Sequence, residues 1–140
     1  MKIFESNSAE ETIEIGKSIA KETNPGDCYA LIGDLGVGKT AFSQGFAQGL
    51  GIEGPVASPT FTILMEYDDG RLPLHHFDVY RIADPMELDE IGFDECVYSD
   101  GVTLIEWADL IKEELPKNTI FVKIEKDLKK GFDYRKITIE

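Results

Sequence analysis

The chain has 140 residues, of which 42% are hydrophobic, and it carries a formal net charge of −13 from 14 basic and 27 acidic residues. This length fits one compact domain, so we expect residues 1–140 to form a single domain with a hydrophobic core. The acidic balance argues against direct binding of nucleic acid, which depends mainly on Lys and Arg neutralising phosphates, so contact with RNA would need a more basic partner. Acidity that keeps a cytoplasmic protein in solution accounts for the charge equally well. No apolar run is long enough to span a bilayer and the N-terminus lacks an apolar signal segment, so we expect a cytoplasmic location without membrane contact.

The first part of the chain predicts a strand, a helix and a second strand. Residues 2–5 are typical of a short edge strand. Ser8 followed three residues later by Glu11 is a capping-box pattern, which predicts a helix to about residue 22. The nearly all-apolar run over 28–32 is typical of a central strand that is covered on both faces.

A glycine-rich segment follows this strand. Gly33-Asp34-Leu35-Gly36-Val37-Gly38-Lys39-Thr40 matches the pattern G-x-x-x-x-G-K-[ST], and a helix is expected directly after it, over 39–50. Glycines let successive backbone N–H groups point at one anion, and the N-terminus of the helix adds its positive dipole end. Lys39 would contact the β- and γ-phosphates of a nucleoside triphosphate, and the Thr40 hydroxyl would bind Mg²⁺. The predicted nucleotide-binding residues are Gly33, Asp34, Leu35, Gly36, Val37, Gly38, Lys39, Thr40 and Ala41.

The second half predicts a hairpin and then further strands and helices. Two strand-like runs, 61–67 and 72–80, flank a turn at Asp68-Asp69-Gly70-Arg71. The other expected elements are a helix from Asp84, with Pro85 in its first turn, to Gly92, a strand from Val102 to Ile105 closed by Glu106, a helix from Ala108 to Leu115, and strands over 119–125 and 136–139. Two apolar strands that each run into a helix favour a parallel core, to which the hairpin would add antiparallel strands. The predicted fold class is therefore α/β, a P-loop NTPase-like mixed β-sheet with flanking helices and an inserted β-hairpin.

Glu106 is the candidate for the second half of a nucleotide site. Ligands of open α/β sheets bind at the carboxyl ends of the core strands, where both the glycine loop and Glu106 fall. Glu106 then holds the Walker B position as a metal-site acid, although a surface Glu that closes a strand remains an alternative. Trp107 stands where vigorous ATPases often carry a second acid, which predicts slow hydrolysis by the isolated protein.

Two further segments could complete the site. Thr60, in the turn Ser58-Pro59-Thr60-Phe61, could contact the γ-phosphate as a switch residue does, but a plain turn is the commoner meaning of such a segment. Asp78 could orient water or a Mg²⁺-bound water, and strand alternation places it on one face with His76. Taken without further information, a solvated strand end is the commoner meaning of these residues. A zinc site at His75 and His76 is not expected, because adjacent strand residues face opposite sides and no Cys or His cluster stands nearby in the sequence.

Four segments together resemble one family, the TsaE family of bacterial P-loop ATPases: Gly33 to Thr40, Ser58 to Phe61, His76-Phe77-Asp78-Val79-Tyr80-Arg81 and Leu104-Ile105-Glu106-Trp107. The resemblance covers almost the whole chain. It implies an ATP- and Mg²⁺-dependent role beside the TsaB–TsaD pair, which transfers a threonylcarbamoyl group to adenosine 37 of tRNAs reading ANN codons. It also implies that the partners, not this chain, contact tRNA.

The resemblance carries roles to individual residues. Lys39 and Thr40 become phosphate and Mg²⁺ contacts, Glu106 the metal-site acid and Trp107 a nearby conformational reporter. Thr60 and Asp78 become catalytic or switch-like candidates, so that the implied catalytic set is Lys39, Asp78, Glu106 and Thr60.

Three other functions are weighed against this one. A small P-loop kinase would usually need an arginine-bearing lid, and the sequence has no Arg-rich insert. A GTPase would normally carry an Asn-Lys-x-Asp segment, which is absent. A nucleotide-dependent scaffold that binds ATP without hydrolysing it stays open, because the sequence does not identify the group that activates water.

Overall fold

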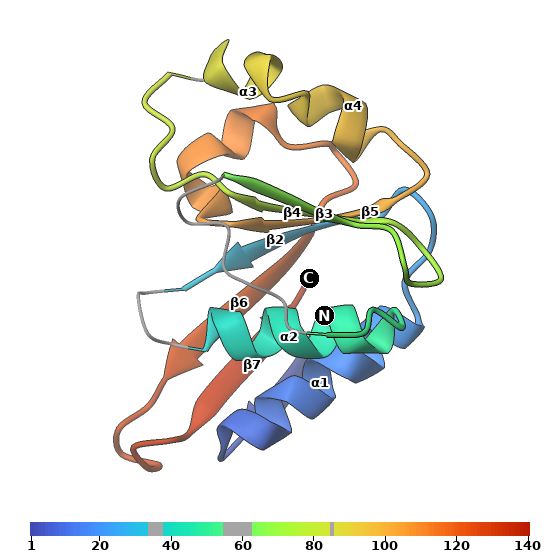
Figure 1. The fold of residues 1–140 in the computed structure, drawn as a ribbon. Coiled ribbons are helices and arrows are strands. Elements are labelled where there is room, and N and C mark those ends of the chain that lie inside the picture. Colours follow the sequence, from blue (N-terminus) through green and yellow to red (C-terminus); the bar gives the residue numbers. More distant parts are fainter. Residues whose placement is uncertain (34–37, 55–62, 85) are drawn as a thin grey trace.

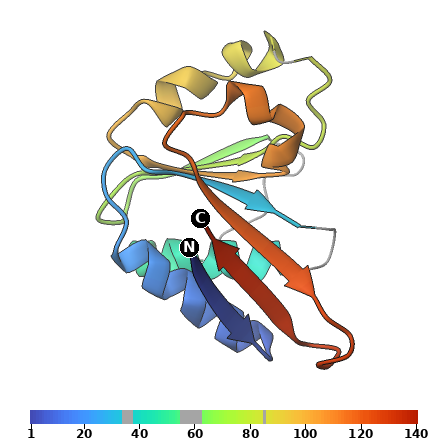
Figure 2. The same cartoon turned by 180° about the vertical axis from the view of Figure 1, so that it is seen from behind.

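A computed structural model of the chain describes residues 1–33, 38–54, 63–84 and 86–140. These residues form a seven-stranded sheet with helices on both faces (Figures 1 and 2). In chain order the strands are β1 (Lys2–Ser6), β2 (Cys28–Ile32), β3 (Leu64–Tyr67), β4 (Leu74–Asp78), β5 (Val102–Glu106), β6 (Ile120–Lys126) and β7 (Arg135–Ile139). The helices are α1 (Ala9–Lys21), α2 (Lys39–Gly49), α3 (Met86–Glu90), α4 (Phe93–Val97) and the 3₁₀ helix η1 (Ala108–Glu114).

The strand order is β1-β7-β6-β2-β5-β4-β3, with β2 at the centre. β6, β2, β5 and β4 run parallel to one another, while β3 pairs antiparallel with β4, β7 with β6 and β1 with β7. The prediction that the hairpin would add antiparallel strands is therefore only half right. β3 is antiparallel to β4, but β4 pairs in parallel with β5, from Leu74 opposite Val102 to Asp78 opposite Glu106. The hairpin extends the parallel core by one strand and supplies an edge.

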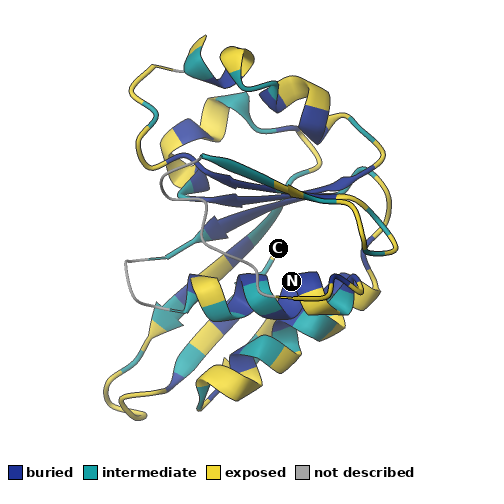
Figure 3. Ribbon diagram, in the orientation of Figure 1, coloured by how far each residue is buried: buried dark blue, intermediate teal, exposed yellow. Residues whose placement is uncertain are grey.

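The sheet separates two hydrophobic cores. Figure 1 shows α1 and α2 below the sheet and α3, α4 and η1 above it. Successive side chains of β2 point into opposite cores. Tyr29 and Leu31 pack toward α1 and α2, whereas Cys28 and Ala30 pack toward the opposite layer. Figure 3 shows the consequence as buried strands between two helical layers whose outer surfaces are exposed.

The helices below the sheet begin and end as local sequence dictates. The Ser8 hydroxyl accepts a hydrogen bond from the Glu11 N–H at 3.1 Å, which caps α1 as predicted. The Glu11 carboxylate reaches the N–H of Asn7, one residue earlier than in a regular capping box. α2 ends before Gly51, whose φ of +87° is the left-handed conformation that favours glycine after a helix.

The segments above the sheet differ most from expectation. The helix expected from Asp84 to Gly92 is the shorter α3; Asp84 accepts from the N–H of Met86, and Pro85 lies outside the described residues. α4 was not predicted. The expected helix over 108–115 is instead η1, in which Ile111 has non-helical backbone angles. None of the described helices combines the length and apolar character that a bilayer crossing requires.

Candidate functional site

The carboxyl ends of three neighbouring strands meet at the candidate site. Leu31 on β2 lies opposite Glu106 on β5, and Glu106 lies opposite Asp78 on β4. Paired residues of a parallel ladder face the same side of the sheet, and Leu31 belongs to the core between the sheet and α2. The carboxylates of Glu106 and Asp78 therefore lie on the face that carries α2, whose first residue is Lys39. The carboxyl ends of β2 and β5 therefore lie side by side, while the central residues of the glycine loop, 34–37, lie outside the described part of the chain.

Lys39 has an almost fully buried side chain, with 6% exposure. Its ammonium Nζ donates to the backbone carbonyl of Gly33 at 2.8 Å and lies 3.5 Å from the centroid of the Trp107 indole ring. Both groups are uncharged. Gly38, directly before the helix, has a φ of +108°, so that a side chain there would be strained. Thr40 is exposed in the first turn of α2, where its hydroxyl is open to a ligand.

Glu106 is buried, not a surface residue that closes a strand, with 5% exposure. His76 Nε2 lies 2.7 Å from Glu106 Oε2, and His76 is itself 1% exposed. Since an ionised carboxylate can only accept, Nε2–H is the donor. His76 Nδ1 is buried and has no hydrogen-bond partner among the described residues. The buried imidazole thus fixes one carboxylate oxygen of Glu106 by a charge-assisted hydrogen bond.

His76 was not among the predicted site residues. Strand alternation correctly placed it on the face of Asp78, and that was the available signal. Its contact with Glu106 depends on the parallel pairing of β4 with β5, which the sequence did not indicate.

Asp78 is 4% exposed, so its interpretation as a solvated strand end is wrong, as it is for His76. Its Oδ1 accepts from the Tyr80 N–H at 3.0 Å, and its own N–H donates to the carbonyl of Ile63 at 2.8 Å. Ile63 has a φ of +69°, which is strained for a β-branched residue. Such strain concentrates at functional sites, and it occurs here beside Asp78.

Trp107 also has a left-handed backbone, with a φ of +61°. This turn follows the end of β5 and starts η1, and it lays the indole against Lys39. The ring of Tyr80 contacts the indole, with centroids 4.7 Å apart. The side chain of Trp107 is therefore part of the environment of the phosphate-loop lysine.

Several predicted residues are outside the described part of the chain. These are Asp34, Leu35, Gly36, Val37 and Thr60. Gly33, Gly38, Lys39 and Thr40 lie at the two ends of the glycine loop, and Ala41 is half-buried in the first turn of α2.

The donor set suits a magnesium–polyphosphate ligand. A buried ammonium that contacts a carbonyl and an indole can exchange these two partners for phosphate oxygens, and the Thr40 hydroxyl and Glu106 carboxylate are hard oxygen ligands of the kind that Mg²⁺ prefers. The strand, the left-handed glycine and the helix that starts at Lys39 stand in the order that a phosphate loop requires. Fold and site together define a P-loop NTPase-like α/β protein.

Comparisons with known proteins name the family. The family model of TsaE, the threonylcarbamoyl adenosine biosynthesis protein, matches residues 6–137. A "tRNA threonylcarbamoyladenosine biosynthesis protein TsaE" of Bacillus subtilis is 51% identical over 129 residues, which are 92% of this chain and 78% of that protein. The protein of the same name from Treponema pallidum is 43% identical over 119 residues, 85% of this chain and 87% of the other. A crystal structure of Bacillus subtilis YdiB matches with a TM-score of 0.84 and 44% identity, over 99% of this chain and 83% of that one. The chain belongs to the TsaE family, a family of tRNA threonylcarbamoyladenosine biosynthesis proteins.

Proposed function

We propose that this chain binds ATP with Mg²⁺ and hydrolyses it slowly, as the ATPase component of the cytoplasmic machinery that makes N6-threonylcarbamoyladenosine at position 37 of tRNA, acting with the TsaB–TsaD pair. Family membership supports the pathway. One structural observation carries the ATPase: the buried Lys39 ammonium at the start of α2 and the buried Glu106 carboxylate at the end of β5 lie on the same face of the sheet.

Lys39 acts by exchanging partners. Its Nζ leaves the Gly33 carbonyl and the Trp107 indole and moves to the β- and γ-phosphate oxygens. Thr40 and Glu106 would hold Mg²⁺, which neutralises phosphate charge when it is bound. His76 orients Glu106 by hydrogen-bonding to Oε2, which leaves the other carboxylate oxygen as the one that would bind the metal or its water.

Asp78 is the candidate for positioning water, because it lies next to Glu106 in the sheet and is buried. One of its oxygens already accepts from the backbone of Tyr80, which orients the carboxylate. Trp107 directly follows Glu106, where a second acid would speed hydrolysis. Slow turnover by the isolated protein, below about 1 s⁻¹, is the expected consequence. The net charge of −13 supports a division of labour in which the partners contact tRNA.

The test is reconstitution with TsaB–TsaD and an unmodified tRNA, following ATP consumption and modified tRNA together. Lys39→Ala should abolish support of modification while circular dichroism shows an unchanged fold. Lys117→Ala, which removes an exposed lysine from a turn, is the matched control and should behave as wild type. Modification at the wild-type rate with Lys39→Ala would refute the proposed role. Modification without ATP consumption in single-turnover assays, with and without the partners, would instead support the non-hydrolysing scaffold.

A further inference from the structure

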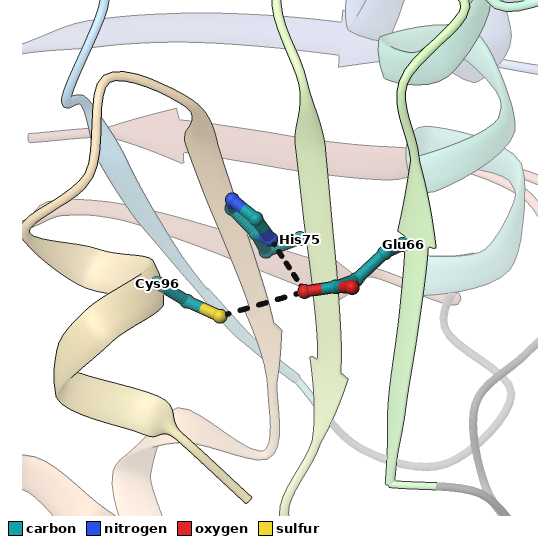
Figure 4. A group of neighbouring side chains, drawn as sticks. All are labelled: Glu66, His75 and Cys96. Atoms are coloured by element: carbon teal, nitrogen blue, oxygen red, sulfur yellow. Dashed lines mark hydrogen bonds and ion pairs between the residues drawn. The ribbon is translucent and has the colours of Figure 1, made fainter.

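Three metal-ligating side chains meet on the face of the hairpin opposite His76. Glu66 comes from β3, His75 from β4 and Cys96 from α4 (Figure 4). Glu66 and His75 are direct neighbours across the hairpin, and α4 places Cys96 beside them. His75 Nδ1 lies 3.1 Å from Glu66 Oε1, Cys96 Sγ lies 3.8 Å from the same oxygen, and the three ligand atoms all lie within 4.8 Å of one another.

The two ring nitrogens of His75 have different neighbours. Nδ1 faces the carboxylate of Glu66 at 3.1 Å, and Nε2 lies 3.4 Å from Ser99 Oγ. The Ser99 hydroxyl donates to the carbonyl oxygen of Cys96 at 2.6 Å, so its oxygen is left to accept from the Gly101 N–H and from an Nε2–H of His75. With the ring proton on Nδ1 the imidazole donates to Glu66, and with the proton on Nε2 the Nδ1 lone pair faces the carboxylate and is available to a cation.

We propose that Glu66, His75 and Cys96 bind a divalent transition-metal ion, with Zn²⁺ as the best match. Zn²⁺ bonds of about 2.0 Å to N and O and about 2.3 Å to S, at tetrahedral angles, separate N from O by about 3.3 Å and S from either by about 3.5 Å. The observed separations of 3.1 and 3.8 Å are close to these values, so the main adjustment is approach of the thiol to the imidazole.

The chemistry of the donors selects the metal. A thiolate and an imidazole favour Zn²⁺ over Mg²⁺ or Ca²⁺, which prefer oxygen ligands. When Nδ1 binds the metal, the Nε2–H of His75 would donate to Ser99 Oγ, 3.4 Å away, which is the outer hydrogen bond that metal-bound histidines usually make. Three protein ligands leave the fourth position to water, and the exposed side of Glu66 is where that water would enter.

A nucleophilic cysteine is the other function that a Cys–His–Glu group suggests, and the geometry disfavours it. The Cys96 thiol donates to Glu66 and not to His75. Burial, together with the neighbouring Glu66, raises the pKa of the Cys96 thiol to about 11, which is the opposite of activation. On metal binding the thiol loses its proton to solvent and the metal–sulfur bond forms. The zinc site that the sequence argued against was one formed by His75 and His76, and Cys96 could not be placed beside His75 because α4 was not predicted.

Cobalt(II) provides a specific test, because a cysteine-bound Co²⁺ shows a thiolate-to-metal charge-transfer band. Nucleotide-free protein, stripped with EDTA and kept reduced, is titrated with Co²⁺ and then with Zn²⁺. We expect one Co²⁺ per chain with this band, and its loss when Zn²⁺ displaces the cobalt. Cys96→Ser should remove the band, and His75→Ala should lower Zn²⁺ affinity by at least about tenfold. Cys28→Ser changes the other buried cysteine, on β2 and two strands away from His75, and should leave both properties unchanged.

A wild-type protein without a thiolate band, or a band that survives Cys96→Ser, would overturn the proposal and leave a hydrogen-bonded cluster only. Should Cys96→Ser fail to fold, Glu66→Gln keeps the test decisive, since this side chain is 59% exposed and its loss as a ligand should still weaken Zn²⁺ binding. A band shared by Cys28→Ser and wild type but absent from Cys96→Ser identifies the ligand directly.

Discussion

The contacts of Lys39 with Gly33 and Trp107 set how much ATP affinity its removal should cost. Its hydrogen bond to the Gly33 carbonyl at 2.8 Å is charge-assisted and contributes about 1.5–3 kcal/mol. The indole of Trp107, 3.5 Å from the ammonium, adds about 0.5–2 kcal/mol. Lys39 gives up both when it moves to phosphate. With central values, these two contacts contribute about 3.5 kcal/mol before ATP arrives.

Magnesium limits what Lys39 gains in return. The β- and γ-phosphates of ATP together carry roughly one net negative charge once Mg²⁺ is bound. A unit charge about 4 Å from the ammonium is worth about 4 kcal/mol at an effective dielectric constant of about 20. The difference is about 0.5 kcal/mol, so Lys39→Ala should weaken binding of magnesium-ATP only about twofold. We therefore expect this variant to lose hydrolysis while it retains most of its binding.

Titration calorimetry of wild type, Lys39→Ala and the control Lys117→Ala with magnesium-ATP measures this difference. The control should match wild type. A loss of affinity above about a hundredfold, or about 2.7 kcal/mol, would refute the reasoning, because it would mean that the contacts with Gly33 and Trp107 do not offset the phosphate contact. Repeating the titration without Mg²⁺ should enlarge the effect of the substitution, since the phosphates then keep their full charge.

Three other substitutions have signs that the structure determines. Trp107→Leu removes the indole from Lys39 in the nucleotide-free protein, so affinity for magnesium-ATP should rise by about two- to thirtyfold in the same calorimetric assay. Cys28→Ala should remove a pH dependence of unfolding. Burial raises the pKa of the Cys28 thiol from 9.0 to about 11, so the folded state holds the thiol proton more tightly than the unfolded state does. As the pH rises from 9 to 11, wild type should therefore lose up to about 3 kcal/mol of unfolding free energy relative to the variant. Gly45→Ala should lower the unfolding free energy in urea by at least about 1–3 kcal/mol, because a Cβ there would lie 2.0 Å from the backbone oxygen of Ile13 where α1 and α2 cross.

Each of these outcomes has a clear opposite. Weaker ATP binding by Trp107→Leu would show that the indole contacts the nucleotide and does not restrain the lysine. Equal pH profiles for wild type and Cys28→Ala would show that the thiol titrates alike in both states. For Gly45→Ala the matched control is Gln48→Ala, an exposed position on the same helix that should change stability by no more than about 0.5 kcal/mol; equal stabilities of the two variants would contradict close packing of α1 on α2.

The elements that carry the phosphate loop could be predicted because their signals are local. The apolar run of β2, the glycine pattern and the start of α2 at Lys39 are contiguous in the sequence, and the bounds of β2 agree with prediction. Glu106 could be placed because it directly follows an apolar strand, and parallel strands end at the same edge of a sheet.

What could not be predicted depends on pairing between distant segments. The local sequence of β4 does not show whether this strand pairs only with β3 or also pairs in parallel with β5. The pairing with β5 brings His76 to Glu106, 30 residues away in the sequence. α4 is a single short turn of helix after Gly92, too short for a recognisable apolar period, so the approach of Cys96 to His75 was hidden as well. The left-handed backbone of Trp107 has no sequence signal, because a bulky residue rarely adopts it.

The position of the site acids is in the end a matter of hydrophobic burial on β4. Leu74 is buried in the core below the sheet and Phe77 in the core above it, both with 0% exposure. A slip of one residue between β4 and β5 would turn each side chain of β4 to the opposite face of the sheet. Phe77 would then leave the core above the sheet, and His76 and Asp78 would point away from Glu106. Burying a phenylalanine is worth about 1.5–3 kcal/mol, which is more than most single hydrogen bonds contribute. Burial of the apolar residues therefore fixes the register of β4 against β5. This register in turn places His76 and Asp78 beside Glu106.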